Sequence, residues 1–175
     1  RGITRRPPVR QKTSGVMRHL AEAFRNFGVL FRSSLIGLII GVMPGSGPTI
    51  GSVVSYGIEK RFGRCKARMG YGAPQGVIAA EAANNGGTGG ALVPMFALGI
   101  PGDAVTAILI GALLIHGLQP GPYLFLEQPA LVSSLFLLFV VGNVLFLILG
   151  LLGLPVLVRI QQTPACYLLP IVALL

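Results

Sequence analysis

The segment SSLIGLIIGVM-PGSGP-TIGSVVSYGI, residues 33–58, decides the fold of this chain. The apolar run Ser33–Met43 leads into the break Pro44–Pro48, and a second run, Thr49–Ile58, follows it. Eleven helical residues rise about 16 Å, roughly half of a ~30 Å hydrocarbon core. Because the prolines and glycines of the break cannot continue a regular helix, the segment predicts two half-helices joined by a non-helical tip.

The composition around this segment predicts an all-α integral membrane protein that is polytopic and has discontinuous helices. The chain is 53% hydrophobic and 11% charged, and its mean hydropathy is +0.76. From Met69 to Val158 there is no Lys or Arg, and the acidic residues are Glu81, Asp103 and Glu127. Ninety residues without a cation cannot cover a surface that faces water, so we expect lipid around this part of the chain.

The positive charge is concentrated beside the apolar segments. The net charge is +9, and eight of the fourteen cations lie in residues 1–32, five in residues 60–68 and one at Arg159. This placement follows the positive-inside pattern and suits contact with the lipid bilayer, so we expect residues 60–68 to form a basic cytoplasmic loop. The basic stretches lack interleaved aromatic residues and any reader motif, so no nucleic-acid partner is expected.

Both flanks of residues 33–59 are basic, and this bears on their topology. Positive-inside reasoning places both flanks in the cytoplasm, which favours a re-entrant hairpin that enters and leaves the membrane on one side. A single broken span is the alternative.

The residues before this unit predict a basic loop and an amphipathic interfacial helix, together covering residues 1–32. Apolar residues recur there at helical spacing, at Met17, Leu20, Phe24, Phe27 and Phe31. Such a helix lies in the headgroup region with its aromatic side chains toward the lipid.

Residues 69–129 predict a polar Glu/Asn segment and a second broken helix or re-entrant hairpin. The Gly/Asn run 84–90 is expected to be buried in protein or to line a watery cavity, because its backbone would be left unsatisfied in lipid. The apolar run Ala91–Leu98 then reads as a half-helix, ended by the break Gly99–Asp103 and followed by a second half-helix, Ala104–Gly117.

The last part of the chain predicts a loop and two spans. Residues 118–129 read as an interfacial loop. Residues 130–159 predict an uninterrupted transmembrane helix, and residues 160–175 the start of a further, truncated transmembrane segment.

The two breaks are candidates for solute binding. Helices broken at mid-membrane bind solutes in many secondary transporters, because half-helix N-termini offer N–H groups to anions and exposed carbonyls hold cations. The substrate-binding candidates at the breaks are Pro44, Gly45, Ser46, Gly47, Gly99, Pro101 and Gly102. Thr49 and Asp103 are candidates for the coupling ion, although Asp103 reads first as the N-cap of the following helix. The alternative is that both breaks are ordinary kinks for packing.

Glu81, Asn84 and Asn85 form the most polar cluster of the apolar region. A carboxylate inside a membrane is costly and by default functional, so Glu81 and Asn84 are candidates for the coupling ion. Asn84 and Asn85 can also donate to a carboxylate substrate. The alternative is an interfacial Glu81 beside a solvated turn.

The sequence contains no nucleophile elbow, metal-binding helix motif, Walker loop or dinucleotide fingerprint. We therefore expect no enzyme activity, no metal beyond a possible Na⁺, and no cofactor other than Na⁺ or H⁺ as a coupling ion.

Several motifs stand in order between Phe31 and Arg159. They are MPGSG (43–47), YGIEKR (56–61), GVIAAEAANN (76–85), LGIPG (98–102) and HGLQPGP (116–122). Together they resemble the C-terminal half of the large permease (TctA-type) subunit of the tripartite tricarboxylate transporter family. Ala80 departs from the Pro that the family has before the Glu, and Gly86–Thr88 replaces a more Ala-rich run.

The resemblance implies a multi-pass protein of the bacterial inner membrane. A periplasmic solute-binding protein delivers a carboxylate, a small membrane subunit assists, and an ion gradient drives the uptake. Carried over by motif, the functional residues are Pro44, Gly45, Gly47, Glu81, Asn84, Asn85, Pro101 and Gly102. The alternative function is a membrane-embedded scaffold or assembly subunit that does not itself transport.

Overall fold

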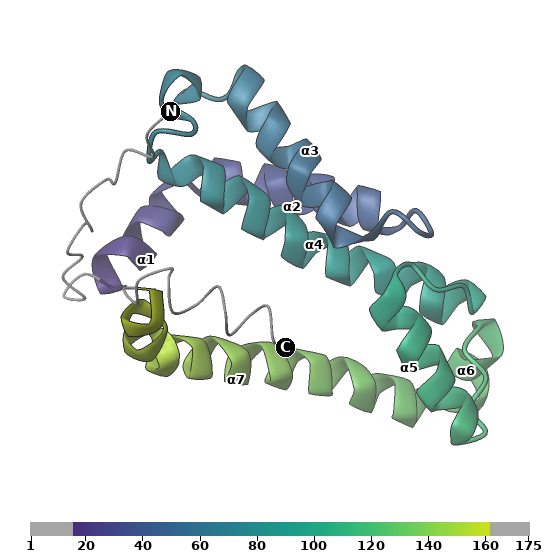
Figure 1. Cartoon of the computed structure of the whole chain (residues 1–175). Coiled ribbons are helices and arrows are strands. Elements are labelled where there is room, and N and C mark those ends of the chain that lie inside the picture. Colours follow the sequence, from purple (N-terminus) through teal and green to yellow (C-terminus); the bar gives the residue numbers. More distant parts are fainter. Residues whose placement is uncertain (1–15, 162–175) are drawn as a thin grey trace, which may run out of the picture. The chain divides into compact units, whose positions relative to one another are not determined.

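The computed structural model describes residues 16–161, and within this range every regular element is a helix, which confirms the all-α prediction for these residues. The predicted basic loop at residues 1–15 and most of the predicted further span lie outside the described residues. The elements are α1 (Val16–Arg25), α2 (Phe27–Gly41), α3 (Gly47–Phe62), the 3-10 helix η1 (Lys66–Arg68), α4 (Pro74–Leu98), α5 (Ala104–Ile115), α6 (Pro122–Glu127) and α7 (Pro129–Gln161) (Figure 1). Residues 17–132 form one compact unit, and most of α7 belongs to another.

Helices α2, α3 and α4 pack side by side (Figure 1). A Cβ atom built on Gly41 of α2 would lie 2.8 Å from the Gly87 Cα of α4, and one built on Gly87 would lie 2.8 Å from the Pro48 Cα of α3. Toward the other ends of α3 and α4, a Cβ on Gly76 of α4 would lie 3.0 Å from the Tyr56 ring of α3. Helix α3 therefore runs antiparallel to α4, and α2 and α3 form a helical hairpin.

Small residues on one face of α4 make this close packing possible. Glycine and alanine recur there at three- and four-residue spacing and are buried: Gly76, Ala79, Ala83, Gly87, Gly90 and Ala91. Residues at this spacing share a face of a helix, and small side chains let helix backbones approach closely.

The continuity of α4 corrects one expectation and changes the reason for another. The Gly/Asn run 84–90 lies in the middle of a 25-residue helix, which satisfies its backbone groups. Gly87 and Gly90 of this run are buried in protein, as expected, whereas Asn84 and Asn85 are exposed. Ala91–Leu98 is the last part of this helix and not a separate half-helix. Glycine weakens an isolated helix, but packing of the glycine face against α2 and α3 supplies the stability that the local sequence lacks.

The predicted amphipathic helix is also corrected, because Asn26 interrupts it. The Asn26 side chain donates to the Glu22 carbonyl oxygen at 2.8 Å, and Gln75 Nε2 donates to Asn26 Oδ1 at 3.1 Å. Asparagine side chains compete for backbone carbonyls in this way and favour helix ends. Phe27 and Phe31 consequently belong to α2, which starts six residues before the expected Ser33.

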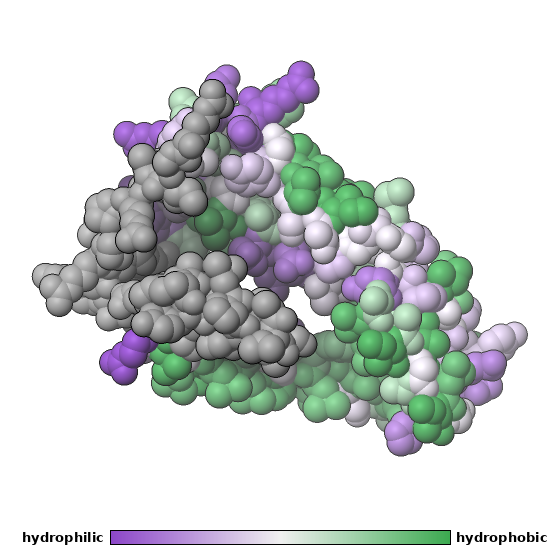
Figure 2. Space-filling view, in the orientation of Figure 1, coloured by the Kyte–Doolittle hydropathy of each residue, from purple (hydrophilic) through white to green (hydrophobic). Residues whose placement is uncertain are grey.

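The C-terminal elements differ from the prediction in one place. The expected interfacial loop 118–129 contains the short helix α6. The helix expected over residues 130–159 is present as α7, with 33 residues. Among the described residues α7 is the one helix long and apolar enough to cross a membrane, over Pro129–Leu157. Figure 2 shows hydrophobic residues along its length.

Candidate functional site at the two helix breaks

The first break joins α2 to α3 through a short turn. Gly45 and Gly47 have positive φ angles of 82° and 63°, which glycine adopts without steric cost. Ser46 Oγ lies 2.6 Å from the carbonyl oxygens of Ile40 and Met43, so the candidate Ser46 caps the end of α2. Pro44 is exposed in the turn. The N-terminus of α3 has no side-chain cap, and Thr49 is exposed in its first turn.

The second break joins α4 to α5, and its own side chains satisfy the ends of both helices. Gly99 ends α4 in the left-handed conformation, and its N–H donates to the Met95 carbonyl at 3.0 Å. Asp103 Oδ1 accepts from the Thr106 N–H at 2.7 Å, and the Thr106 hydroxyl accepts from the Asp103 N–H at 2.8 Å. This capping box gives Asp103 the N-cap role that its position predicts. Pro101 is exposed between these residues.

The two breaks lie in direct contact, although about 57 residues separate them in the chain. The Gly45 N–H donates to the Gly102 carbonyl oxygen at 2.9 Å. Gly102 is buried, and a Cβ atom built on it would lie 2.7 Å from the Ala91 Cα of α4. A Cβ on Gly47 would lie 3.8 Å from the Asp103 Cβ. The N-termini of α3 and α5 therefore meet beside Ala91.

The polar candidates of α4 form an exposed stripe beside its glycine face, and Ala91 lies at the border between the two. The stripe consists of Glu81, Asn84, Asn85 and Thr88. Asn85 Nδ2 donates to the Glu81 carbonyl at 3.0 Å, and the Thr88 hydroxyl donates to the Asn84 carbonyl at 3.1 Å.

Helix geometry places this stripe relative to the breaks. Ala91, Thr88 and Asn84 share one face, and Asn84 lies two turns, about 10 Å, before Ala91. Glu81 and Asn85 also line a hollow of about 400 Å³ between α4 and α2, together with Ser34 of α2. The structure thus joins Gly45 of the first break to Gly102 of the second. It sets the polar candidates Glu81, Asn84 and Asn85 along α4, which leads away from the two breaks.

The opposite end of the hairpin holds an ion pair that sequence reasoning missed. Glu59, the last residue of the predicted unit 33–59, lies in α3, is buried with 3% of its side chain exposed, and pairs with Arg32 of α2. Its register could have indicated this, because Gly51, Ser55 and Glu59 are spaced by four residues and share the buried face.

Comparisons with known proteins support a transport assignment. A family model described as "Tripartite tricarboxylate transporter TctA family" matches residues 3–175. A 52.8 kDa protein of Agrobacterium vitis, encoded in the TAR-I ttuC' 3' region, is 35% identical over 150 residues, which are 85% of this chain and 30% of that protein. A second protein of this organism, from the TAR-II ttuC' 3' region, is 35% identical over 138 residues, 79% of this chain and 57% of that protein. No solved structure matches.

Proposed function

The chain belongs to the tripartite tricarboxylate transporter TctA family, and we propose that it carries the carboxylate site of the large permease subunit. The transport would be secondary, driven by an ion gradient and dependent on a binding protein. The proposed partners are a periplasmic solute-binding protein and a small membrane subunit in the inner membrane of a bacterium. The whole permease would be multi-pass, and the α2–α3 hairpin would be its re-entrant element.

The hydrogen bond between Gly45 and Gly102 is the observation that carries this proposal. It brings the N-termini of two helices to one place, and the N-terminus of a helix carries unpaired N–H groups and a positive partial charge. The α3 end has no side-chain cap, so a carboxylate can accept from its N–H groups. Glycine at position 45, where an added Cβ atom would meet nothing within 4 Å, lets a ligand approach the backbone closely.

A coupling cation follows from the charge beside this end. The Asp103 carboxylate caps α5 and lies next to Gly47, so it repels a carboxylate at the α3 N-terminus. A Na⁺ or H⁺ bound at Asp103 removes the repulsion, and each ligand then strengthens the binding of the other. Glu81 and Asn84, on the stripe that leads to this point, are the other proposed positions for the ion.

One observation favours the alternative of a scaffold without transport. Ser46, Gly99 and the Asp103–Thr106 pair satisfy helix-end groups at both breaks, as kinks built for packing also do. The two functions differ in whether the breaks bind substrate.

Uptake of labelled di- and tricarboxylates tests the proposal in cells that carry the full-length protein with its partners. We expect uptake that needs all three components and stops when the ion gradient is collapsed. Uptake that continues without the gradient would refute the proposed ion coupling. Normal uptake in cells that lack this subunit would refute the permease function and favour the scaffold alternative.

The topology has its own test, cysteine labelling at the hairpin base. Gly28→Cys and Lys60→Cys flank the hairpin, and a Cβ on Gly28 has nothing within 4 Å. We expect both cysteines to react from the cytoplasmic side alone. Labelling from opposite sides would replace the re-entrant hairpin by a single broken span.

A further inference from the structure

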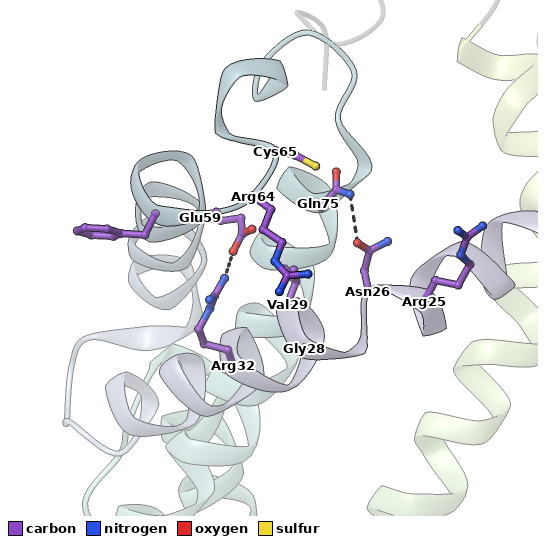
Figure 3. A pocket seen from close by; sticks show the side chains of 11 residues that line it. Arg25, Asn26, Gly28, Val29, Arg32, Glu59, Arg64, Cys65 and Gln75 are labelled. Atoms are coloured by element: carbon purple, nitrogen blue, oxygen red, sulfur yellow. Dashed lines mark hydrogen bonds and ion pairs between the residues drawn. The ribbon is translucent and has the colours of Figure 1, made fainter.

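A hollow of about 490 Å³ lies at the base of the α2–α3 hairpin, away from the two breaks. Residues of several elements line it, among them Arg25, Arg32, Glu59, Phe62, Arg64 and Gln75. Figure 3 shows Arg25 on one side of the view and Arg32 and Arg64 on the other, with the hydrogen bond between Asn26 and Gln75 in the middle.

The lining of this hollow has an excess of positive charge. Three arginines face one glutamate, and that glutamate, Glu59, is buried and already paired with Arg32. Arg25 and Arg64 are exposed at the rim. An adjoining hollow of about 400 Å³ contains Glu22 and shares Arg25 and Gln75 with the first, so the charge balance is most positive on the Arg32 and Arg64 side. A guanidinium group presents its N–H donors in a planar fork that can bind two phosphate oxygens at once.

Four exposed phenylalanines lie at this hollow or next to its lining residues in the chain. Phe62 lines it, and Phe24, Phe27 and Phe31 each adjoin a lining residue; they are 69%, 72%, 58% and 60% exposed. Phe27 and Phe31 stack with their ring centroids 6.1 Å apart. Exposed aromatic side chains next to a basic hollow do not contribute to the binding of a soluble anion. They can contact the acyl chains of a lipid whose charged headgroup lies in the hollow.

We propose that this hollow binds the phosphate headgroup of an anionic phospholipid, with the acyl chains lying against the four phenylalanines. Arg25 and Arg64 hold the phosphate, while the Arg32–Glu59 pair and the Asn26–Gln75 hydrogen bond fix the walls. The site is independent of transport at the breaks, and it ties the hairpin base to the leaflet that carries anionic lipid.

Lipid binding to the purified full-length protein in neutral detergent tests this site. The probes are phosphatidylglycerol, phosphatidylcholine, glycerol 3-phosphate and inorganic phosphate, and native mass spectrometry measures retained lipid. We expect phosphatidylglycerol to bind about tenfold or more tightly than phosphatidylcholine. The double variant Arg25→Gln/Arg64→Gln should lose about 25-fold in phosphatidylglycerol affinity, since each arginine that holds the phosphate contributes about fivefold.

The matched control is Lys60→Gln/Lys66→Gln, which removes the same charge from exposed residues outside the hollow. The control should lose less than about threefold, and an equal loss would mean diffuse attraction and no site. Competition by glycerol 3-phosphate or inorganic phosphate at concentrations equal to the lipid would overturn the lipid assignment in favour of a soluble phosphate. If the double variant is not monodisperse, Arg64→Gln alone is measured, with an expected loss of about fivefold. An unchanged affinity in that variant would refute the site.

Discussion

The two ends of the α2–α3 hairpin are held by different kinds of interaction. At the tip, a backbone hydrogen bond joins Gly45 to Gly102, and the surrounding residues are glycines and prolines. At the base, the side chains of Arg32 and Glu59 form a partly buried ion pair. At the tip the contact is made by backbone groups, and the N-terminus of α3 has no side-chain cap. At the base the contact is made by side chains, and the hollow beside it has an excess of positive charge. The difference is in keeping with the proposed substrate site at the tip and the proposed lipid site at the base.

The largest effect is expected from a side chain forced into the tip. Gly102→Leu has no room, because even a Cβ atom would lie 2.7 Å from the Ala91 Cα. The two breaks must separate, and a displacement of about 1 Å costs roughly a hundredfold in rate at an organised site. We expect uptake to fall by about that factor while membrane insertion persists.

Gly57→Leu is the control for this variant, since a Cβ at Gly57 meets nothing within 4 Å. It should transport normally. Wild-type uptake by Gly102→Leu would mean that the two breaks do not form the substrate site.

The next largest effect is expected from breaking the ion pair at the base. It should lower the free energy of unfolding and leave the affinity for substrate unchanged. Arg32→Ala leaves Glu59 buried without its partner. Because the Arg32 side chain is 46% exposed, we expect a loss of about 1–3 kcal/mol, below the cost for a fully buried pair. Unfolding of the purified protein measures it.

Adding Glu59→Gln to this variant should recover most of the loss, because the amide carries no charge. Lys60→Ala, next to the pair but exposed, serves as the control. If Arg32→Ala changed the substrate affinity at an equal amount of folded protein, the base would also take part in substrate binding, and the proposed division of roles between tip and base would be wrong.

Variants of the polar stripe on α4 test how far the substrate site extends from the tip. Asn84→Ala should weaken substrate binding by about 1–3 kcal/mol, the cost of an unmatched polar partner. Asn85→Ala should cost less, since Asn84 and not Asn85 shares the face of Ala91. Calorimetry on the full-length protein distinguishes the two, and the reverse order would move the substrate to the hollow beside Ser34.

The smallest effect is expected at Glu81, the stripe residue farthest from the breaks. Glu81→Gln should reduce the dependence of uptake on Na⁺ or pH by about fivefold, the lower range for coupled ligands. Uptake at varied Na⁺ and pH checks this. An unchanged dependence would exclude Glu81 as the ion site and leave Asp103 and Asn84 as the proposed positions.

The sequence allowed the two breaks and the long apolar helix to be predicted, because proline, glycine and uniform hydrophobicity act locally. Asp103 was placed as an N-cap for the same reason, since a capping box needs only a few neighbouring residues. Of the candidate site, Gly45 of the first break and Gly102 of the second lie in direct contact.

What the sequence did not predict depends on tertiary contacts. Taken by itself, the run 84–90 is a poor helix former. Its glycines are nevertheless part of a helix because they allow α2 and α3 to pack closely against α4. The Asn26 interruption depends on a hydrogen bond from Gln75, nearly fifty residues away. Glu59 looks like a loop charge until its partner across the hairpin is known.

The glycine face of α4 has a mechanical consequence. Helices that touch through long side chains can slide, because rotamers rearrange as one ridge passes another. Where Gly41, Gly87 and Pro48 meet almost backbone to backbone, there are no side chains to absorb such a shift. The three helices are therefore expected to move as one rigid body. Any motion that alternately exposes the tip to the two sides of a membrane must then be taken up outside this body, as at residues 99–103, which join α4 to α5.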